Sequence, residues 1–165
     1  EKIVMGRQEV KAEIFLDLLA NARRRAELEQ RYEDATERLY RAIEVLAQVR
    51  LSEKGFNTND IDTVRLPASL REEFTRRYTS RIDGKIKFGL EAAYGLLLEL
   101  GDGLGSVFDK HWNNLKVLFE ARNLSILAHG FAPIKPERYQ QLWEMALKIS
   151  DTRPERLPQF PRMEF

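Results

Sequence analysis

Apolar residues recur at three- and four-residue steps along most of the chain, and this is the period of an amphipathic α-helix. One run covers residues 14–26 and a second covers residues 35–49, with a polar break at residues 29–31 between them. So short a break predicts an antiparallel helical hairpin. No stretch alternates convincingly between apolar and polar residues, so we expect no strand. The sequence predicts an all-α fold, a compact multi-helix bundle in a single domain over residues 1–150.

Four further helices are predicted from their periodicity and their end signals. They are a helix that begins near residue 70, and helices over residues 86–100, 108–129 and 136–149. Ser69 and Glu72 have the spacing of an N-terminal capping box, and Pro136 suits a first helical turn. Residues 86–100 are apolar on nearly every side, so we expect this helix at the centre of the core. The tail, residues 151–165, contains three prolines and is expected to be extended.

Two glycine patterns mark the ends of predicted helices. The stretch Gly101-Asp-Gly-Leu-Gly105 superficially suggests a phosphate-binding loop. Such a loop needs a strand before it and an ordered helix start behind it. The preceding residues have a helical pattern instead, so we expect a flexible turn. Gly130 suits the left-handed cap that closes the helix over residues 108–129.

Composition excludes several classes of site. The 165 residues include no cysteine, which excludes disulfides, thiolate nucleophiles and cysteine-ligated metal centres and fits a reducing cytoplasm. Only two histidines are present. On one continuous helix, His111 and His129 would lie about 27 Å apart, too far to share a metal ion. We therefore expect no metal and no cofactor.

Charge and hydropathy give no global bias toward a partner. Lys and Arg number 27 against 26 Asp and Glu, a net charge of +1, so an anion-binding surface must arise from local arrangement. The uninterrupted apolar runs are too short to span a bilayer. The chain opens at Glu1 without a signal-peptide pattern, and we expect it to be part of a longer cytoplasmic protein.

The candidate chemistry lies near the end of the helix predicted over residues 108–129. Arg122 and His129 are seven residues apart, so on a helix they share a face within about 20° and lie about 10 Å apart along the axis, with Ser125 on the same face. The arginine offers a permanent charge and a fork for phosphate oxygens, and the histidine a nitrogen that titrates near neutral pH. With 18 arginines in the chain, this spacing alone also fits a surface arginine and a helix-terminal histidine.

The residues around this pair carry a family resemblance. The string Arg122-Asn-Leu-Ser-Ile-Leu-Ala-His-Gly130 resembles the signature of the HEPN ribonuclease superfamily, an arginine, usually a polar residue, then four to six residues and a histidine. The stretch from Phe15 through Tyr32 to the segment after Leu39 is similar to the HEPN part of CRISPR-associated CARF–HEPN proteins. The similarity covers roughly residues 12–150, although only the Arg–His segment is a specific motif.

The resemblance implies an activity and roles for individual residues. Arg122, Asn123 and His129 match the family's active-site positions. Similar HEPN ribonucleases form two-fold dimers with one composite cleft and cut single-stranded RNA without metal, using the ribose 2′-OH and leaving a 2′,3′-cyclic phosphate. Arg122 would stabilise charge on phosphorus, Asn123 would orient its neighbours or the RNA, and His129 would act as base, acid or positioning group. The implied setting is CRISPR-type antiviral defence.

The resemblance also implies a regulatory domain that this sequence lacks. CARF–HEPN proteins carry an N-terminal α/β domain that binds cyclic oligoadenylate and activates the nuclease. No Rossmann-like strand pattern occurs in these residues. We therefore expect that the domain has been removed, or that this is a stand-alone HEPN protein.

Two further groups of basic residues lie outside the Arg–His motif. A basic set with interleaved aromatics follows the helix that begins near residue 70, and it could contact the RNA backbone or be a solvated helix end. It comprises Arg76, Arg77, Arg81, Lys85 and Lys87. The run Arg23-Arg24-Arg25 points in three directions on its helix and is expected to be mostly solvated surface.

Two non-catalytic alternatives remain open. The pattern from Tyr32 to Ala42 resembles one helix of a tetratricopeptide repeat, so the chain could be a helical-hairpin interaction or dimerisation module. No second copy of that repeat is present, although such repeats need several copies to bury a core. HEPN-like helices could also persist as a regulatory interaction surface. A scaffold of either kind would tolerate alanine at His129, whereas a nuclease would not.

Overall fold

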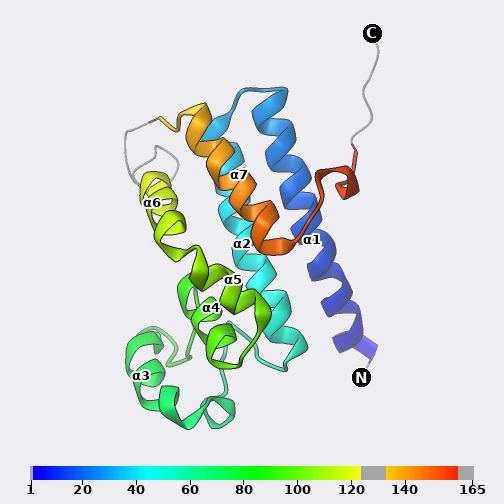
Figure 1. Cartoon of the computed structure of the whole chain (residues 1–165). Helices are drawn as coiled ribbons and strands as arrows, with labels where there is room; N and C mark the ends of the chain where they lie inside the picture. Colours follow the sequence, from blue (N-terminus) through cyan, green and yellow to red (C-terminus); the bar gives the residue numbers. More distant parts are fainter. Residues whose placement is uncertain (1, 124–132, 160–165) are drawn as a thin grey trace.

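The computed structural model describes residues 2–123 and 133–159, with side chains described from residue 13 onward. Within these ranges the chain forms seven α-helices and two 3-10 turns, with one isolated bridge between Thr79 and Ile86. The helices are α1 (Lys2–Glu27), α2 (Tyr32–Glu53), α3 (Ala68–Tyr78), α4 (Leu90–Glu99), α5 (Gly103–Lys110), α6 (Trp112–Asn123) and α7 (Pro136–Ser150), and the 3-10 turns are η1 (Thr63–Arg65) and η2 (Pro154–Arg156) (Figure 1). The predicted all-α fold is confirmed.

Helices α1 and α2 form the predicted antiparallel hairpin (Figure 1). The turn between them is closed by Gln30, whose backbone is left-handed with φ of 52°. This conformation lets the Arg31 amide donate a 2.9 Å hydrogen bond to the Arg25 carbonyl, which satisfies a carbonyl at the end of α1. Leu19 and Leu39 are fully buried between the two helices and their neighbours, so apolar packing fixes the hairpin.

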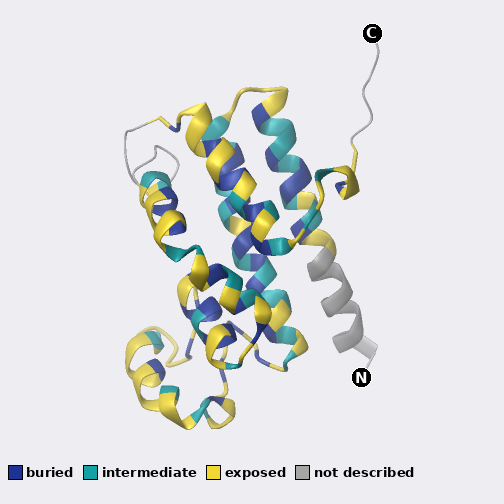
Figure 2. Cartoon of the chain, viewed as in Figure 1, coloured by how far each residue is buried: buried dark blue, intermediate teal, exposed yellow. Residues whose placement is uncertain are grey.

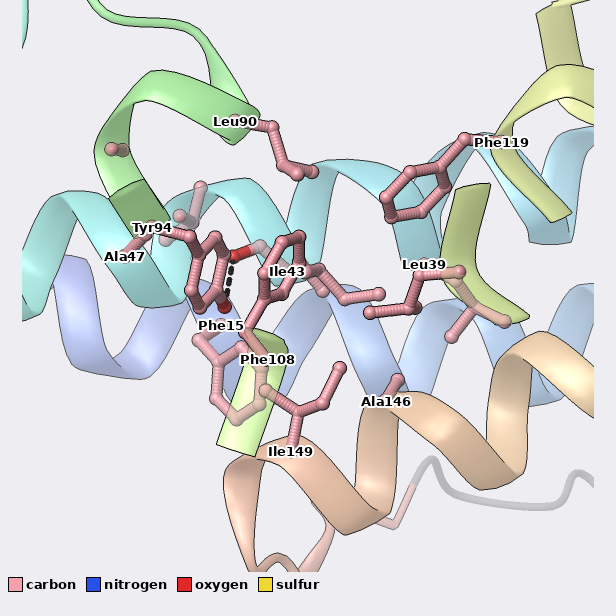
Figure 3. Packing of buried hydrophobic residues seen from close by; sticks show 14 of the residues in the cluster. Phe15, Leu39, Ile43, Ala47, Leu90, Tyr94, Phe108, Phe119, Ala146 and Ile149 are labelled. Atoms are coloured by element: carbon pink, nitrogen blue, oxygen red, sulfur yellow. Dashed lines mark hydrogen bonds between the residues drawn. The ribbon is translucent and has the colours of Figure 1, made fainter. Parts of the chain in front are cut away.

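The core forms around α2, where side chains from six helices meet (Figure 3). Tyr94 of α4 is 1% exposed, and its hydroxyl donates a 2.9 Å hydrogen bond to the Ile43 carbonyl of α2. Its ring stacks on Phe108 of α5 with centroids 3.8 Å apart. Buried residues face inward on every helix of this group, whereas α3 is mostly exposed (Figure 2).

The third and fourth helices begin at residues other than those predicted. Helix α3 starts at Ala68 after Pro67, and Ser69 makes no capping contact. Helix α4 begins at Leu90 rather than at residue 86, because residues 86–89 are extended. Phe88 packs edge-to-face on Phe74 and Tyr78 of α3. These tertiary contacts keep residues 86–89 extended, although their sequence pattern is helical.

The prediction of a flexible turn at Gly101–Gly105 is wrong. The Asp102 carboxylate accepts a 3.0 Å hydrogen bond from the Leu104 amide and caps α5, which begins at Gly103. Its other oxygen lies 2.9 Å from both Arg50 and Lys54 of α2. The Asp102 side chain is 2% exposed, so a buried, charge-paired carboxylate fixes the junction between α4 and α5.

Two other boundaries also differ from prediction. The single helix expected from residue 108 is divided at His111, where α5 ends and α6 begins. The tail was expected to be extended, but it forms η2 and buries Leu157, which is 4% exposed. The last helix, α7, runs from Pro136 to Ser150, which agrees with the predicted range.

Replacing Gly105 with alanine is expected to destabilise the fold by about 1–3 kcal/mol. A Cβ at this position would lie 2.3 Å from the Leu98 backbone nitrogen and 2.6 Å from the Leu97 carbonyl carbon, and backbone atoms cannot easily move aside. Gly95→Ala in α4 is the matched control. Among the described residues no atom lies within 4 Å of a Cβ at Gly95, so this change should be neutral or stabilising by up to about 1 kcal/mol. Urea unfolding measures both, and equal effects would contradict the close α4–α5 approach.

Asp102→Asn is expected to reduce the amount by which the free energy of unfolding falls between neutral and acidic pH. Burial alone would raise the pKa of Asp102, but hydrogen bonds from Lys54, the Leu104 amide and Arg50 outweigh it and lower the pKa. The ionised carboxylate therefore adds stability above its unfolded pKa of about 3.9, and this is lost as the pH falls through the lower folded value. Unfolding free energies measured between pH 7 and pH 2 should show wild type losing about 1–2 kcal/mol more than the variant. If the unfolding free energy of wild type and variant falls equally with pH, the lowered pKa of Asp102 is contradicted.

Candidate active site

Arg122, the arginine singled out in the sequence, lies in the last turn of α6 and contacts α2. One of its terminal nitrogens, Nη2, is 2.6 Å from Glu37 Oε2. The two side chains are 22% and 24% exposed, so the ion pair is partly shielded but remains open to solvent. The residues are 85 positions apart in sequence, so this contact exists only because α6 packs beside α2.

An aromatic ring lies beneath the guanidinium. Arg122 Cζ is 4.3 Å from the centroid of the Tyr40 ring, a cation–π distance. Tyr40 in turn packs edge-to-face on Phe119, one turn before Arg122, with centroids 5.0 Å apart. Burial, with a smaller contribution from Glu44, raises the pKa of Tyr40. The hydroxyl therefore stays neutral near pH 7, and the ring is a fixed apolar support for the cation.

Asn123 also contacts the guanidinium. Arg122 Nη1 donates a 3.0 Å hydrogen bond to Asn123 Oδ1. Arg122 Nε and Glu37 Oε1 are buried and have no hydrogen-bond partner among the described residues. Glu37, Tyr40 and Asn123 thus constrain one cation from three directions, and the Arg122 side chain remains 22% exposed. Such a group can bind a phosphate oxygen with little loss of side-chain entropy.

The other predicted residues of the motif follow α6 in the sequence. Ser125 and His129 lie in residues 124–132, outside the described residues, as does the expected helix cap at Gly130. The described chain resumes with a contact to the same helix, because the Ile134 amide donates a 3.1 Å hydrogen bond to Glu33 Oε1. Glu33 and Glu37 are one turn apart on α2, roughly 6 Å. Arg122 and Ile134, which lie before and after residues 124–132 in the sequence, therefore both contact the first turns of α2.

The predicted basic set lies elsewhere in the molecule. Arg76 and Arg77 are on α3, and the others follow it in the segment leading to α4. Lys85 pairs with Asp60 at 2.8 Å, and Lys87 pairs with Asp83 at 2.6 Å and lowers the pKa of that carboxyl to about 2. Figure 1 shows α3 at the opposite end of the bundle from the end of α6. One chain therefore does not bring this set beside Arg122.

The arginines of α1 are less solvated than expected. Arg23, Arg24 and Arg25 are all of intermediate burial. The Arg25 side chain is 23% exposed and pairs with Glu29 and Asp34. The expectation of a mostly solvated run is wrong for Arg25, because the turn into α2 brings acidic residues against it.

The described residues contain no candidate metal centre. Over residues 2–123 and 133–159, no group of three or more His, Cys, Asp or Glu side chains could hold an ion. His111 sits at the junction of α5 and α6, so the continuous-helix distance to His129 does not apply. In the same ranges, no helix is both long and apolar enough to cross a membrane.

Glu37 and Tyr40 were not identified as site residues from the sequence. They follow Glu33 at helical spacing on α2, so an acidic and aromatic face was visible in the pattern. Nothing in that pattern indicates which helix covers the face. Packing of α6 against it decides that Arg122 is the partner.

Comparison with known proteins identifies a family. The family model for the Csm6 HEPN domain matches residues 5–152, which spans α1 to the end of α7. No curated protein matches the sequence. The match covers most of the chain and includes both the Arg122 segment and the face of α2 that holds it. The chain therefore belongs to the Csm6 HEPN domain family, a CRISPR-associated family whose domains are typically ribonucleases.

Proposed function

We propose that this domain is a metal-independent endoribonuclease that cleaves single-stranded RNA in CRISPR-linked antiviral defence. The observation that carries the proposal is the constrained guanidinium of Arg122, held by Glu37 at 2.6 Å and supported by Tyr40 at 4.3 Å. It occurs at the arginine of the motif in a domain of a ribonuclease family. A non-catalytic scaffold has no evident need for a partly exposed cation fixed in this way.

In the proposed reaction the ribose 2′-oxygen attacks the adjacent phosphorus. A bond forms between the 2′-oxygen and phosphorus, and the bond from phosphorus to the 5′-oxygen breaks, which leaves a 2′,3′-cyclic phosphate. The 2′-OH proton is taken up by a base, and a proton is delivered to the departing 5′-oxygen. Arg122 stabilises negative charge on the phosphoryl oxygens, and its fixed position makes this effective.

The remaining motif residues have narrower proposed roles. Asn123 orients the guanidinium through its 3.0 Å hydrogen bond. His129 is proposed as base, acid or positioning group, and Ser125 as a weak substrate contact. A two-fold dimer that joins the α6 ends would supply two arginines and two histidines to one cleft. The distant basic set on and after α3 would contact RNA outside that cleft, and an N-terminal cyclic-oligoadenylate-binding domain would regulate cleavage.

Replacing His129 or Arg122 with alanine is expected to abolish metal-independent RNA cleavage. The loss should be about 100-fold to 1,000-fold for Arg122→Ala, the scale for removing one preorganised charge-stabilising donor. End-labelled single-stranded RNA incubated in EDTA measures the rate, and phosphatase sensitivity of the product ends identifies the cyclic phosphate. Cleavage that His129→Ala leaves unchanged would contradict the catalytic role and favour a non-catalytic module.

Tyr40→Leu is expected to lower kcat by about twofold to thirtyfold, the range that corresponds to a lost cation–π contact. Tyr40→Phe retains the ring face and should keep most of the activity. Glu37→Gln retains an oxygen acceptor but removes the charge, so it should lower kcat less than Glu37→Ala. Single-turnover cleavage with saturating enzyme separates kcat from binding. Equal losses in Tyr40→Leu and Tyr40→Phe would contradict a positioning role for the ring.

A further inference from the structure

Four arginines gather around two carboxylates at the turn between α1 and α2. We call this group the arginine cluster, and it consists of Arg24, Arg25, Arg31 and Arg38, with Glu29 and Asp34 between them. The group joins the last turns of α1 to the first turns of α2. It lies outside the HEPN motif.

Asp34 is the more enclosed of the two carboxylates. Its side chain is 18% exposed. Arg31 Nη2 lies 3.3 Å and Arg25 Nε 3.5 Å from Oδ2, while Arg38 pairs with Oδ1 and also donates a 2.9 Å hydrogen bond to the Asp34 carbonyl. One carboxylate therefore holds three guanidinium groups close to one another.

Glu29 has a similar arrangement at the turn itself. Arg25 Nη1 donates a hydrogen bond to its Oε2, and Arg24 and Arg31 each approach its carboxylate oxygens to 3.8 Å. Arg31 is 58% exposed, so the cluster is open to solvent on at least one side.

The charge of the cluster is unbalanced. Glu29 and Asp34 are each approached by three guanidinium groups, so cations outnumber carboxylates among the ion pairs of this group. Mutual repulsion of guanidiniums that share the same two acids is relieved when a further anion binds. The planar fork of arginine matches the oxygens of a phosphodiester.

The cluster lies at the same end of the molecule as Arg122. Arg38 is adjacent on α2 to Glu37, which holds Arg122, and Asp34 is one turn before them. Helix geometry puts Glu37 and Asp34 about 60° apart around α2 and about 4.5 Å apart along its axis. Figure 1 shows the α1–α2 turn and the end of α6 at one end of the bundle. A strand of a few nucleotides bound at Arg122 can therefore reach the cluster.

We propose that the arginine cluster binds a backbone phosphate of the RNA strand, outside the linkage that is cut. This site rests on the proposed ribonuclease function and adds a substrate contact to it. Asp34 and Glu29 hold the guanidiniums together in the absence of RNA and compete with the phosphate for them. The other interpretation is that the ion pairs only lock the α1–α2 hairpin.

Two substitutions with opposite expected effects on RNA binding distinguish these interpretations. Arg38→Gln removes a cation and should weaken binding, whereas Asp34→Asn removes the competing charge and should strengthen it. Both changes break the same ion pair, so a purely structural lock predicts that both destabilise the fold and neither changes affinity. Arg156→Gln on η2 is the control for loss of one positive charge elsewhere.

The measurement is the Kd of the full chain for a fully 2′-O-methylated single-stranded RNA, which lacks the attacking hydroxyl and cannot be cut. Each lost phosphate contact lowers the slope of log Kd against log salt by roughly 0.7. If the variant and wild type bind equally at 1 M salt, this difference in slope makes Arg38→Gln bind about fivefold more weakly than wild type at 0.1 M salt. Thermal unfolding of each variant verifies that the fold is intact.

The results can contradict the phosphate site without contradicting the proposed ribonuclease function. Weaker binding by Arg38→Gln, tighter binding by Asp34→Asn and no change in Arg156→Gln support the phosphate site. If Arg122→Ala weakens binding while Arg38→Gln and Asp34→Asn leave it unchanged, the phosphate site is overturned and the ribonuclease proposal stands. Failure of the wild-type chain to bind the RNA would overturn both.

Discussion

Four helices, α1, α4, α6 and α7, pack against α2, and the shape of the molecule depends on this shared burial. Residues such as Leu39 and Ile43 are almost fully buried, and the Tyr94 hydroxyl is paired inside the core. A helix covered on most sides leaves only a narrow polar face. On α2 that face carries Glu33, Glu37, Asp34 and Arg38, so the requirement for a common core also determines where charge can gather.

The contacts of Arg122 and those of the arginine cluster differ in what they contribute. Partly exposed ion pairs add little net stability, because side-chain entropy and solvent offset the Coulomb attraction. Their effect is on position: Arg122 is held by a carboxylate, an amide oxygen and an aromatic face. A cation fixed before substrate arrives loses less entropy when it binds a phosphate than a free surface arginine does. The arginine cluster is held by carboxylates at the turn between α1 and α2, which suits a contact that binds a strand without taking part in bond breaking.

Several errors of the sequence interpretation share one physical cause. The Gly101–Gly105 stretch has the composition of a flexible turn, but Arg50 and Lys54, about fifty residues earlier, fix Asp102 as a buried helix cap. Residues 86–89 have a helical pattern, yet contacts of Phe88 with α3 keep them extended. In each case a long-range contact outweighs a local preference of about 1 kcal/mol or less.

The sequence alone determines the all-helical class, the α1–α2 hairpin, the last helix and the spacing from Arg122 to His129. These features follow from periodicity and short breaks, which are local properties. The partners of Arg122 cannot be determined from the sequence in this way. Glu37 and Tyr40 lie 85 and 82 residues before Arg122 in the sequence, and they meet it only where α6 packs against α2. Local patterns specify which face of a helix is polar, whereas the packing of the whole core determines which other helix that face meets.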